Sequence, residues 1–334
     1  MLYDLIRPLL FALPPEPAHK AGLAALRVMP DLSVKDPELK VRAFGLDFPN
    51  PIGLAAGFDK YASAVPYWQR LGFGFVELGT FTRLPQEGNA PPRIWRYPGQ
   101  RALINRFGFN NPGADQAALR LRRLRDAGRW PEIRVGISLG KSKATPLDGA
   151  VDDYLYSLAK LKDLADYIAI NVSSPNTPGL RGLQHASVLK KIVVAMAKEA
   201  RQGKKKLPLL AKLAPDLSDK ELLASADAAL AGGASGIIVS NTSSGRTGMP
   251  ETAYPEGGLS GAPIGPRADA CLALLARHTR GKVPLVGSGG VMSVQDALRK
   301  QDLGATLVQV YTGLIYQGPG FPAQICRQIV DNRA

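Results

Sequence analysis

The stretch that decides the fold runs from residue 167 to residue 213 and reads YIAINVSSPNTPGLRGLQHASVLKKIVVAMAKEARQGKKKLPLLAKL. It holds an apolar run at 167–172, a helical pattern over 187–201 and a second apolar run at 209–213. Both runs are rich in Ile, Leu and Ala and do not alternate strictly with polar residues, as is typical of parallel strands buried on both faces. The stretch therefore predicts two buried strands joined by a helix, with the basic run 204–206 in a solvated loop.

The same alternation of apolar runs and helical patterns recurs from residue 50 onward. The other apolar runs lie at residues 52–56, 75–79, 134–139, 236–240, 284–288 and 307–311. The other helical patterns cover residues 115–127, 152–165, 218–231, 266–280 and 293–301. Two of them begin with a start signal, since Ser218 and Ser293 each precede acidic residues. Eight such repeats predict a (β/α)8 TIM barrel. A doubly wound open sheet is the alternative, but it needs a Gly-rich dinucleotide turn after an early strand, and the sequence has none there.

The first forty residues differ from the repeats and predict a short helical hairpin, so we divide the chain into an N-terminal segment, 1–40, and a barrel domain, 41–334. Apolar residues recur at helical spacing up to Leu13, where two prolines end the first helix, and a second helix is expected over 17–29. Asp4 occupies the place where a secretory signal carries positive charge. Two interpretations stay open from the residues alone: a helical cap on the barrel, or an interfacial helix pair that dips into a bilayer.

Composition limits the other possibilities. The chain has 334 residues, 45% of them apolar, which is enough for a large core, and no apolar run approaches the roughly 20 residues of a membrane-spanning helix. Its two cysteines do not make a disulfide framework and indicate a reducing compartment. The net charge of +14 favours an anionic partner, such as nucleic acid, lipid headgroups or an acidic ligand, or it serves solubility alone.

In a TIM barrel, chemistry is performed on the loops that follow the carboxyl ends of the strands. Those loops, with the segment before the third strand, carry carboxamides and two lysines: Lys60, Asn105, Asn110, Asn111, Asn171, Asn176, Lys212 and Asn241. They show no pattern of His, Asp or Glu typical of a metal site, so we expect no metal. A single Asn often only caps a turn. Several Asn-bearing loops at one barrel face instead predict a site for a planar, amide-rich, anionic substrate, because carboxamides both donate and accept hydrogen bonds.

The last two strands are followed by Gly-rich loops. They read GSGG at 287–290 and YTG at 311–313, and a further loop, GLSG at 258–261, offers additional backbone amides. Barrels often bind a phosphate at this place through backbone N–H groups and a helix N-terminus. The pattern fits any phosphorylated ligand.

Taken together, these motifs resemble the quinone-dependent (class 2) dihydroorotate dehydrogenases, essentially from end to end. The motifs are LAAGFDK at 54–60, INRFGFNN at 104–111, NVSSPNTPGLR at 171–181, KLAPDLS at 212–218, SNTS at 240–243 and GGLSG at 257–261. NVSSPNTPGLR is highly specific by itself. The resemblance implies an enzyme of pyrimidine biosynthesis that oxidises (S)-dihydroorotate to orotate, transfers a hydride to FMN and passes the electrons to a membrane quinone, either ubiquinone or menaquinone.

The resemblance also implies a role for individual residues. FMN would be contacted by Ala56, Gly57, Lys60, Thr80, Ser138, Asn171, Lys212 and Ser240, and its phosphate by Gly261, Gly290, Tyr311 and Thr312. The pyrimidine would be held by Lys60, Asn105, Arg106, Phe107, Gly108, Phe109, Asn171, Asn176, Asn241 and Thr242. Ser174 would be the base that takes the C5 proton. The soluble class of the family uses a cysteine there, so a serine supports the quinone class. Ser138 departs from the family, which usually has a longer Asn at this position.

With the resemblance, the N-terminal segment is expected to form the membrane-facing quinone tunnel, lined near the flavin by His19 and Arg96. We therefore expect a monomeric peripheral protein on the cytoplasmic side of the cell membrane, with no nucleic-acid partner.

Three other functions fit parts of the sequence less well. A flavin barrel that reduces uridines in transfer RNA suits the positive charge, but that enzyme type uses a catalytic cysteine. A non-redox barrel acting on a sugar phosphate needs a Glu or His base at the matching strand ends. A non-catalytic membrane protein does not explain the convergent polar loops.

Overall fold

The computed structural model describes residues 2–177, 179–202, 206–250 and 254–333, so most of the basic run 204–206 lies outside the described residues. The centre of the molecule is a closed barrel of parallel strands. In barrel order the strands are β3 (Ile52–Leu54), β4 (Phe75–Phe81), β7 (Arg134–Leu139), β8 (Tyr167–Asn171), β9 (Leu209–Leu213), β10 (Gly236–Val239), β12 (Leu285–Ser288) and β13 (Ala305–Val310). Each predicted apolar run contributes one of these strands, and the predicted TIM barrel is confirmed.

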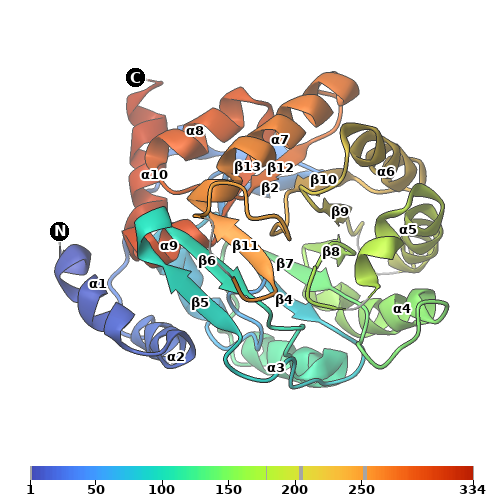
Figure 1. The fold of residues 1–334 in the computed structure, drawn as a ribbon, viewed down its shortest axis with the longest axis horizontal. Helices are drawn as coiled ribbons and strands as arrows, with labels where there is room; N and C mark the ends of the chain where they lie inside the picture. The colour runs from blue at the N-terminus through green and yellow to red at the C-terminus, as the bar shows by residue number, and fades with distance from the viewer. Residues whose placement is uncertain (1, 178, 203–205, 251–253, 334) are drawn as a thin grey trace.

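Helices surround the barrel (Figure 1). They are α3 (Gly113–Asp126), α4 (Ala150–Leu161), α5 (Ala186–Ala200), α6 (Asp219–Ala231), α7 (Gly265–Thr279), α8 (Val294–Asp302), α9 (Thr312–Gln317) and α10 (Phe321–Asp331). The predicted start signals are confirmed at two of them. Ser218 caps α6 in a full capping box with Glu221, and the Ser293 side chain accepts a hydrogen bond from the Asp296 amide at the start of α8.

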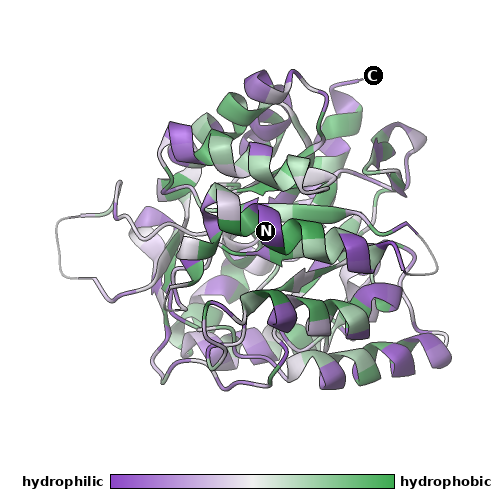
Figure 2. Ribbon diagram, turned by 90° about the vertical axis from the view of Figure 1, so that its right-hand side faces the viewer, coloured by the Kyte–Doolittle hydropathy of each residue, from purple (hydrophilic) through white to green (hydrophobic). Residues whose placement is uncertain are grey.

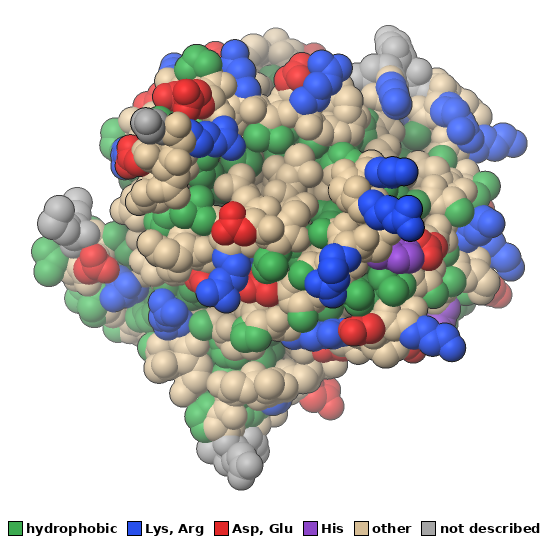
Figure 3. Space-filling view, turned by 90° about the horizontal axis from the view of Figure 1, so that it is seen from above, with side chains coloured by type: hydrophobic (Ala, Val, Ile, Leu, Met, Phe, Trp, Pro, Cys, Tyr) green, Lys and Arg blue, Asp and Glu red, His purple; other side chains and the backbone are tan. Residues whose placement is uncertain are grey.

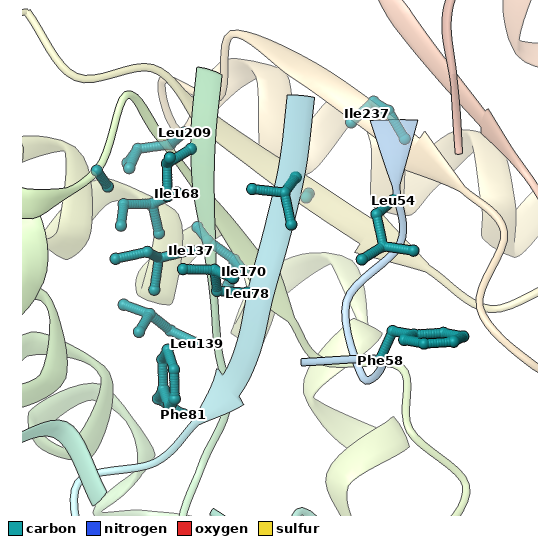
Figure 4. Close-up of a cluster of buried hydrophobic side chains, with 14 of the residues drawn as sticks. Leu54, Phe58, Leu78, Phe81, Ile137, Leu139, Ile168, Ile170, Leu209 and Ile237 are labelled. Carbon is teal, nitrogen blue, oxygen red and sulfur yellow. The ribbon is translucent and has the colours of Figure 1, made fainter. Parts of the chain in front are cut away.

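The core contains strand residues buried on both faces of the barrel wall and the helix residues packed against them. Leu78, Ile137 and Ile170 are fully buried among the side chains of one cluster (Figure 4). Figure 2 shows the same division along the chain, with hydrophobic strands inside and helices that carry hydrophilic residues on their outer sides.

The amino end of the barrel is closed by aromatic rings. The ring of Phe75 lies 5.5 Å from that of Phe48 and 6.4 Å from that of Tyr167. Phe48 comes from a small hairpin of β1 (Val41–Ala43) and β2 (Leu46–Phe48). Because this end is filled, a ligand reaches the barrel from the carboxyl ends of the strands.

A three-stranded antiparallel sheet covers part of that carboxyl end. Its strands are β5 (Ile94–Tyr97), β6 (Ala102–Asn105) and β11 (Gly258–Gly261). The interpretation of residues 258–261 as a loop was therefore wrong. β11 pairs Gly258 with Asn105, about 150 residues earlier, and its small residues give no apolar pattern that sequence reasoning could detect.

The N-terminal hairpin consists of α1 (Leu2–Ala12) and α2 (Pro15–Ala25), which lie together beside the barrel near β5 and α9 (Figure 1). α2 begins earlier than predicted because proline is accepted in the first turn of a helix, and it ends at Ala25 rather than at residue 29. Leu5, Leu9 and Leu13 are 75%, 72% and 46% exposed. Among the described residues, no helix is both long and apolar enough to cross a membrane.

The excess positive charge is distributed over the surface. Figure 3 shows Lys and Arg side chains spread over the face seen from above, with acidic residues between them. Between residues 93 and 134, where arginines are frequent, Arg93 pairs with Glu16 and Arg134 with Asp166, whereas Arg122 is exposed on α3.

Candidate active site

A cavity opens at the carboxyl end of the barrel, beneath the three-stranded sheet. Its lining includes most of the residues predicted to contact cofactor or substrate: Ala56, Gly57, Lys60, Thr80, Asn105, Phe107, Gly108, Phe109, Asn171, Ser174, Asn176, Lys212, Ser240, Asn241, Thr242, Gly261, Gly290, Tyr311 and Thr312. These residues are spread over 257 positions of sequence and are brought together by the barrel and its loops. We call this space the polar cavity.

A hydrogen-bonded network of amides and hydroxyls fixes one wall of the polar cavity. The Asn171 amide donates to Thr80 Oγ1 at 3.0 Å, and its carbonyl oxygen accepts from the Asn241 amide at 3.1 Å. The Asn241 amide also donates to Ser173 Oγ at 2.9 Å. Tyr154, buried beneath, donates to the backbone carbonyl of Asn171 at 2.9 Å. The carboxamides are therefore oriented before any ligand arrives.

Ser174 lies on the loop after β8 and is 6% exposed. Its Oγ accepts a hydrogen bond from the Asn176 backbone amide at 3.3 Å, and the Asn176 side chain donates to Asn105 Oδ1 at 3.1 Å. In the part of the chain that the structure describes, no carboxylate or imidazole is hydrogen-bonded to Ser174. A serine is a weak base in water, so any proton transfer to it must be assisted by the enclosed surroundings and the bound substrate.

Lys60 supplies a cation to the polar cavity. Its Nζ donates to the Gly57 carbonyl and lies 3.9 Å from the centre of the Phe107 ring. Burial, and after it the nearby positive charge of Arg93, lowers the pKa of Lys60 to about 8. The ammonium is therefore charged at neutral pH but loses its proton far more readily than a lysine in water.

Two predicted contact residues do not line the cavity. Ser138 is fully buried below its floor, and its Oγ lies 2.9 Å from Thr80 Oγ1. Arg106 follows the end of β6, where side chains alternate between faces, so Asn105 points into the cavity and Arg106 points away. The Arg106 guanidinium donates to the Pro92 carbonyl and stacks 5.4 Å from the Trp95 ring.

The other end of the polar cavity is built from backbone. Gly261 and Gly290 have φ values of +100° and +78°, and a Cβ on either would come within 2.2 Å of a backbone atom. Only glycine fits at these two positions, and both line the cavity. Tyr311 and Thr312 adjoin them. This end suits a phosphate.

Two buried polar atoms on the cavity wall are available to a planar ligand. Among the described residues, Ser240 Oγ and Gln309 Oε1 have no hydrogen-bond partner. Buried polar atoms are nearly always satisfied in proteins. Sequence reasoning missed Gln309, which lies within an apolar strand. Ser260, Ser288 and Gly289, which lie in the Gly-rich segments predicted to bind a phosphate, also line the cavity. No group of metal-ligating side chains occurs in the described ranges.

A second cavity, of about 800 Å³, lies between the N-terminal hairpin and the barrel and is lined largely by apolar side chains. We call it the apolar cavity. Both predicted tunnel residues line it. The His19 ring meets the Phe58 ring edge-on at 4.9 Å, and burial together with the Lys60 charge lowers the pKa of His19 to about 4, so the imidazole is neutral. Arg96 holds the end of α1 by donating to the carbonyls of Leu10 and Leu13.

The two cavities share a wall. Lys60, Phe107 and Tyr311 line both of them. The hairpin is fastened beside this wall by a bidentate ion pair, in which Arg93 Nε and Nη2 each lie 2.9 Å from a Glu16 carboxylate oxygen. The arrangement places a polar site and an apolar site next to each other, with these three residues between them.

Comparisons with known proteins agree with this geometry. The family model described as dihydroorotate dehydrogenase matches residues 38–332. The chain is 48% identical to dihydroorotate dehydrogenase (quinone) of Gloeobacter violaceus, over 95% of this chain and 91% of that protein. It is 44% identical to the enzyme of the same name from Halorhodospira halophila, over 98% and 97%. The crystal structure of DHODH from Eimeria tenella in complex with ferulenol superposes with a TM-score of 0.89 at 38% identity, covering 95% of this chain and 91% of that one. The resemblance inferred from the motifs is confirmed.

Proposed function

Because the chain belongs to the dihydroorotate dehydrogenase family, we propose that its two adjoining cavities perform the two halves of one reaction. The enzyme oxidises dihydroorotate to orotate in pyrimidine biosynthesis and uses a quinone as electron acceptor. One observation carries this assignment of a half-reaction to each cavity. The polar cavity and the apolar cavity share a wall, which Lys60, Phe107 and Tyr311 form.

The cofactor of the polar cavity is FMN. Gly261, Gly290, Tyr311 and Thr312 would hold its phosphate, and the unpartnered Ser240 Oγ and Gln309 Oε1 would be available to hydrogen-bond with it. Lys212 provides a cation on the same wall. When bound, FMN supplies the hydride acceptor that no side chain can provide. Ser138 acts through Thr80, whose hydroxyl it contacts, and not by touching the cofactor.

The substrate lies beside Ser174. Asn105, Asn171, Asn176 and Asn241 present preoriented carboxamides to the amide groups of the pyrimidine, and Lys60 stabilises its negative charge. Ser174 Oγ takes the proton from C5 while its own hydroxyl proton passes to a relay water, and the hydride that leaves C6 would be accepted by FMN. The hydrogen bond from the Asn176 amide to Ser174 Oγ orients the oxygen. Burial excludes bulk water from the site. The basicity of Ser174 Oγ therefore depends on the bound pyrimidine and on the side chains around it, and not on solvent.

The quinone enters the apolar cavity. His19 and Arg96 are among the polar residues that offer contacts in a largely apolar tunnel, and the exposed Leu5, Leu9 and Leu13 lie in the lipid interface. In this proposal residues 1–40 form a membrane-associating, quinone-binding segment and residues 41–334 the catalytic domain. That division is supported by a family match that begins at residue 38. The protein is then a monomeric peripheral protein on the cytoplasmic side of the cell membrane.

An anaerobic titration tests the proposal. Dihydroorotate is added to the purified protein while the flavin absorbance is followed, and a soluble quinone is added afterwards. Bleaching by dihydroorotate followed by recovery with quinone is the expected result. A colourless protein would contradict the cofactor assignment. A yellow protein that dihydroorotate does not bleach would keep the flavin barrel and contradict the substrate, in which case transfer RNA is the next substrate to test.

A further inference from the structure

A buried carboxylate lies beneath the polar cavity. Glu77 belongs to β4, points into the barrel and is 0% exposed. Its Oε1 lies 3.4 Å from Lys212 Nζ. Its Oε2 accepts hydrogen bonds from the Gln309 amide at 2.8 Å and from the Tyr167 hydroxyl at 3.2 Å. The four residues come from four different strands, β4, β9, β13 and β8, and their side chains meet at Glu77.

This cluster is not required to fill the barrel. An isolated buried charge costs several kcal/mol, and replacing a buried ion pair with apolar residues of similar volume is often neutral or stabilising. The pair is also not isolated from the site, because Lys212 and Gln309 both line the polar cavity whereas Tyr167 belongs to the aromatic floor below. Glu77 thus connects the floor of the barrel to two side chains that face the ligand.

The hydrogen bonds of Glu77 fix its direction. Because Gln309 and Tyr167 both donate to Oε2, the carboxylate is held and Oε1 faces Lys212. Burial, followed by the charge of Glu77, raises the pKa of Tyr167, so this phenol remains a donor. Lys212, whose side chain is 6% exposed, has no other carboxylate within ion-pair distance in the described residues.

We infer that Glu77 is a positioning residue that aims the Lys212 ammonium at the cofactor cavity, and thereby sets the reduction potential of the flavin. The ion pair with Glu77 fixes where the Lys212 charge lies. In that place the charge would stabilise negative charge on a reduced flavin, and a Lys212 side chain released from Glu77 would do so less well. This raises the potential. The inference rests on the proposed function, since it needs FMN in the polar cavity.

The test is Glu77→Gln in the full-length, flavin-loaded protein, with the potential measured by equilibration against a reference dye. We expect the reduction potential to become more negative by at least about 30 mV. For a two-electron couple this is a tenfold decrease in the equilibrium constant for reduction. Tyr167→Phe is the matched control, because it removes one donor to Glu77 but keeps the charges of Glu77 and Lys212. Its equilibrium constant for reduction should change by less than threefold.

The same substitution made in a Lys212→Met protein shows whether Glu77 acts through Lys212. If it does, Glu77→Gln causes no further shift in a Lys212→Met protein. An unchanged or more positive potential in Glu77→Gln would overturn the inference, and so would an equal shift in both backgrounds. If Glu77→Gln fails to retain flavin, Glu77→Asp, which withdraws the carboxylate by one methylene, should shift the potential in the same direction by a smaller amount. A wild-type protein without flavin would overturn the proposed function itself, and this inference with it. A loaded wild type with no shift in the variants overturns the inference alone.

Discussion

Lys60 Nζ lies 3.9 Å from the centre of the Phe107 ring, and these two side chains form part of the partition between the polar and apolar cavities. The Arg93 guanidinium lies 5.7 Å from the same ring and pairs with Glu16 of the N-terminal hairpin. A short series of contacts thus leads from the hairpin to the cation of the substrate site. The charge state of Lys60 therefore depends on how tightly the partition excludes water.

The first prediction concerns the pH dependence of orotate binding. The pKa of Lys60 in the folded protein is lowered to about 8, so its charge is present below that pH and is lost as the pH rises through it. Affinity for the anionic product should therefore fall by roughly tenfold between about pH 7 and about pH 9, rather than near the ordinary lysine pKa of about 10.4. Calorimetric titration at several pH values measures it. Lys60→Met should bind weakly with no such step, and a wild-type affinity that stays constant up to pH 9 would contradict the assignment.

The second prediction concerns the base. Ser174→Ala removes the only side-chain oxygen assigned to the C5 proton, and general-base catalysis typically contributes 10²–10⁴-fold. The variant should retain flavin but show flavin reduction by dihydroorotate slowed by at least about a hundredfold, measured by anaerobic stopped flow. Ser174→Cys is the conservative comparison and should recover part of the rate, since a thiol can take the same proton. Reduction by Ser174→Ala within a few fold of wild type would show that another group is the base.

The barrel was predictable because its strands need only be apolar on both faces, and the site was predictable because strand order alone decides which loops meet. The amides of Asn171 and Asn241, 70 positions apart, were expected on one face and are hydrogen-bonded to each other. The pairing of β11 with β6 was not predictable, because short strands rich in glycine have no pattern and their partner is distant in sequence.

Glu77 shows a different limit of sequence reasoning. It is the one acidic residue within the apolar run 75–79, and sequence reasoning assigned it no role. Its meaning depends on Lys212, Gln309 and Tyr167, which reach it only after the barrel closes. Arg106 illustrates the reverse case. It lies inside a family motif, yet the alternation of side chains after β6 turns it toward Trp95.

The third prediction separates the two cavities. Gly22 lines the apolar cavity, and a Cβ added there would meet no atom within 4 Å. Gly22→Phe should therefore be tolerated, place a ring in the space assigned to the quinone, and slow quinone reduction by at least about tenfold, which is the effect of some 1.4 kcal/mol of lost binding. Flavin reduction by dihydroorotate should not change.

Gly99 provides the matched control for that variant. It is exposed, has equally open space around its Cβ position and lines neither cavity. Gly99→Phe should leave both half-reactions unchanged. Equal slowing of both half-reactions by Gly22→Phe would mean that the hairpin only supports the fold.

The last prediction concerns the membrane surface. Leu5 and Leu9 are 75% and 72% exposed and are separated by about one turn of α1, so they form an apolar stripe open to solvent. Moving a leucine side chain from water into an apolar phase is worth about 1.5–3 kcal/mol. If these side chains enter a bilayer, the double variant Leu5→Ser, Leu9→Ser should bind phospholipid vesicles at least about tenfold more weakly in a sedimentation assay. Its activity with a water-soluble quinone should be retained.

Val194→Ser, which removes an exposed apolar side chain from α5 in the barrel's helical ring, is the control and should bind vesicles like wild type. Equal loss in the two proteins, or no loss in either, would mean that α1 does not hold the protein on the membrane and that its leucines face another partner.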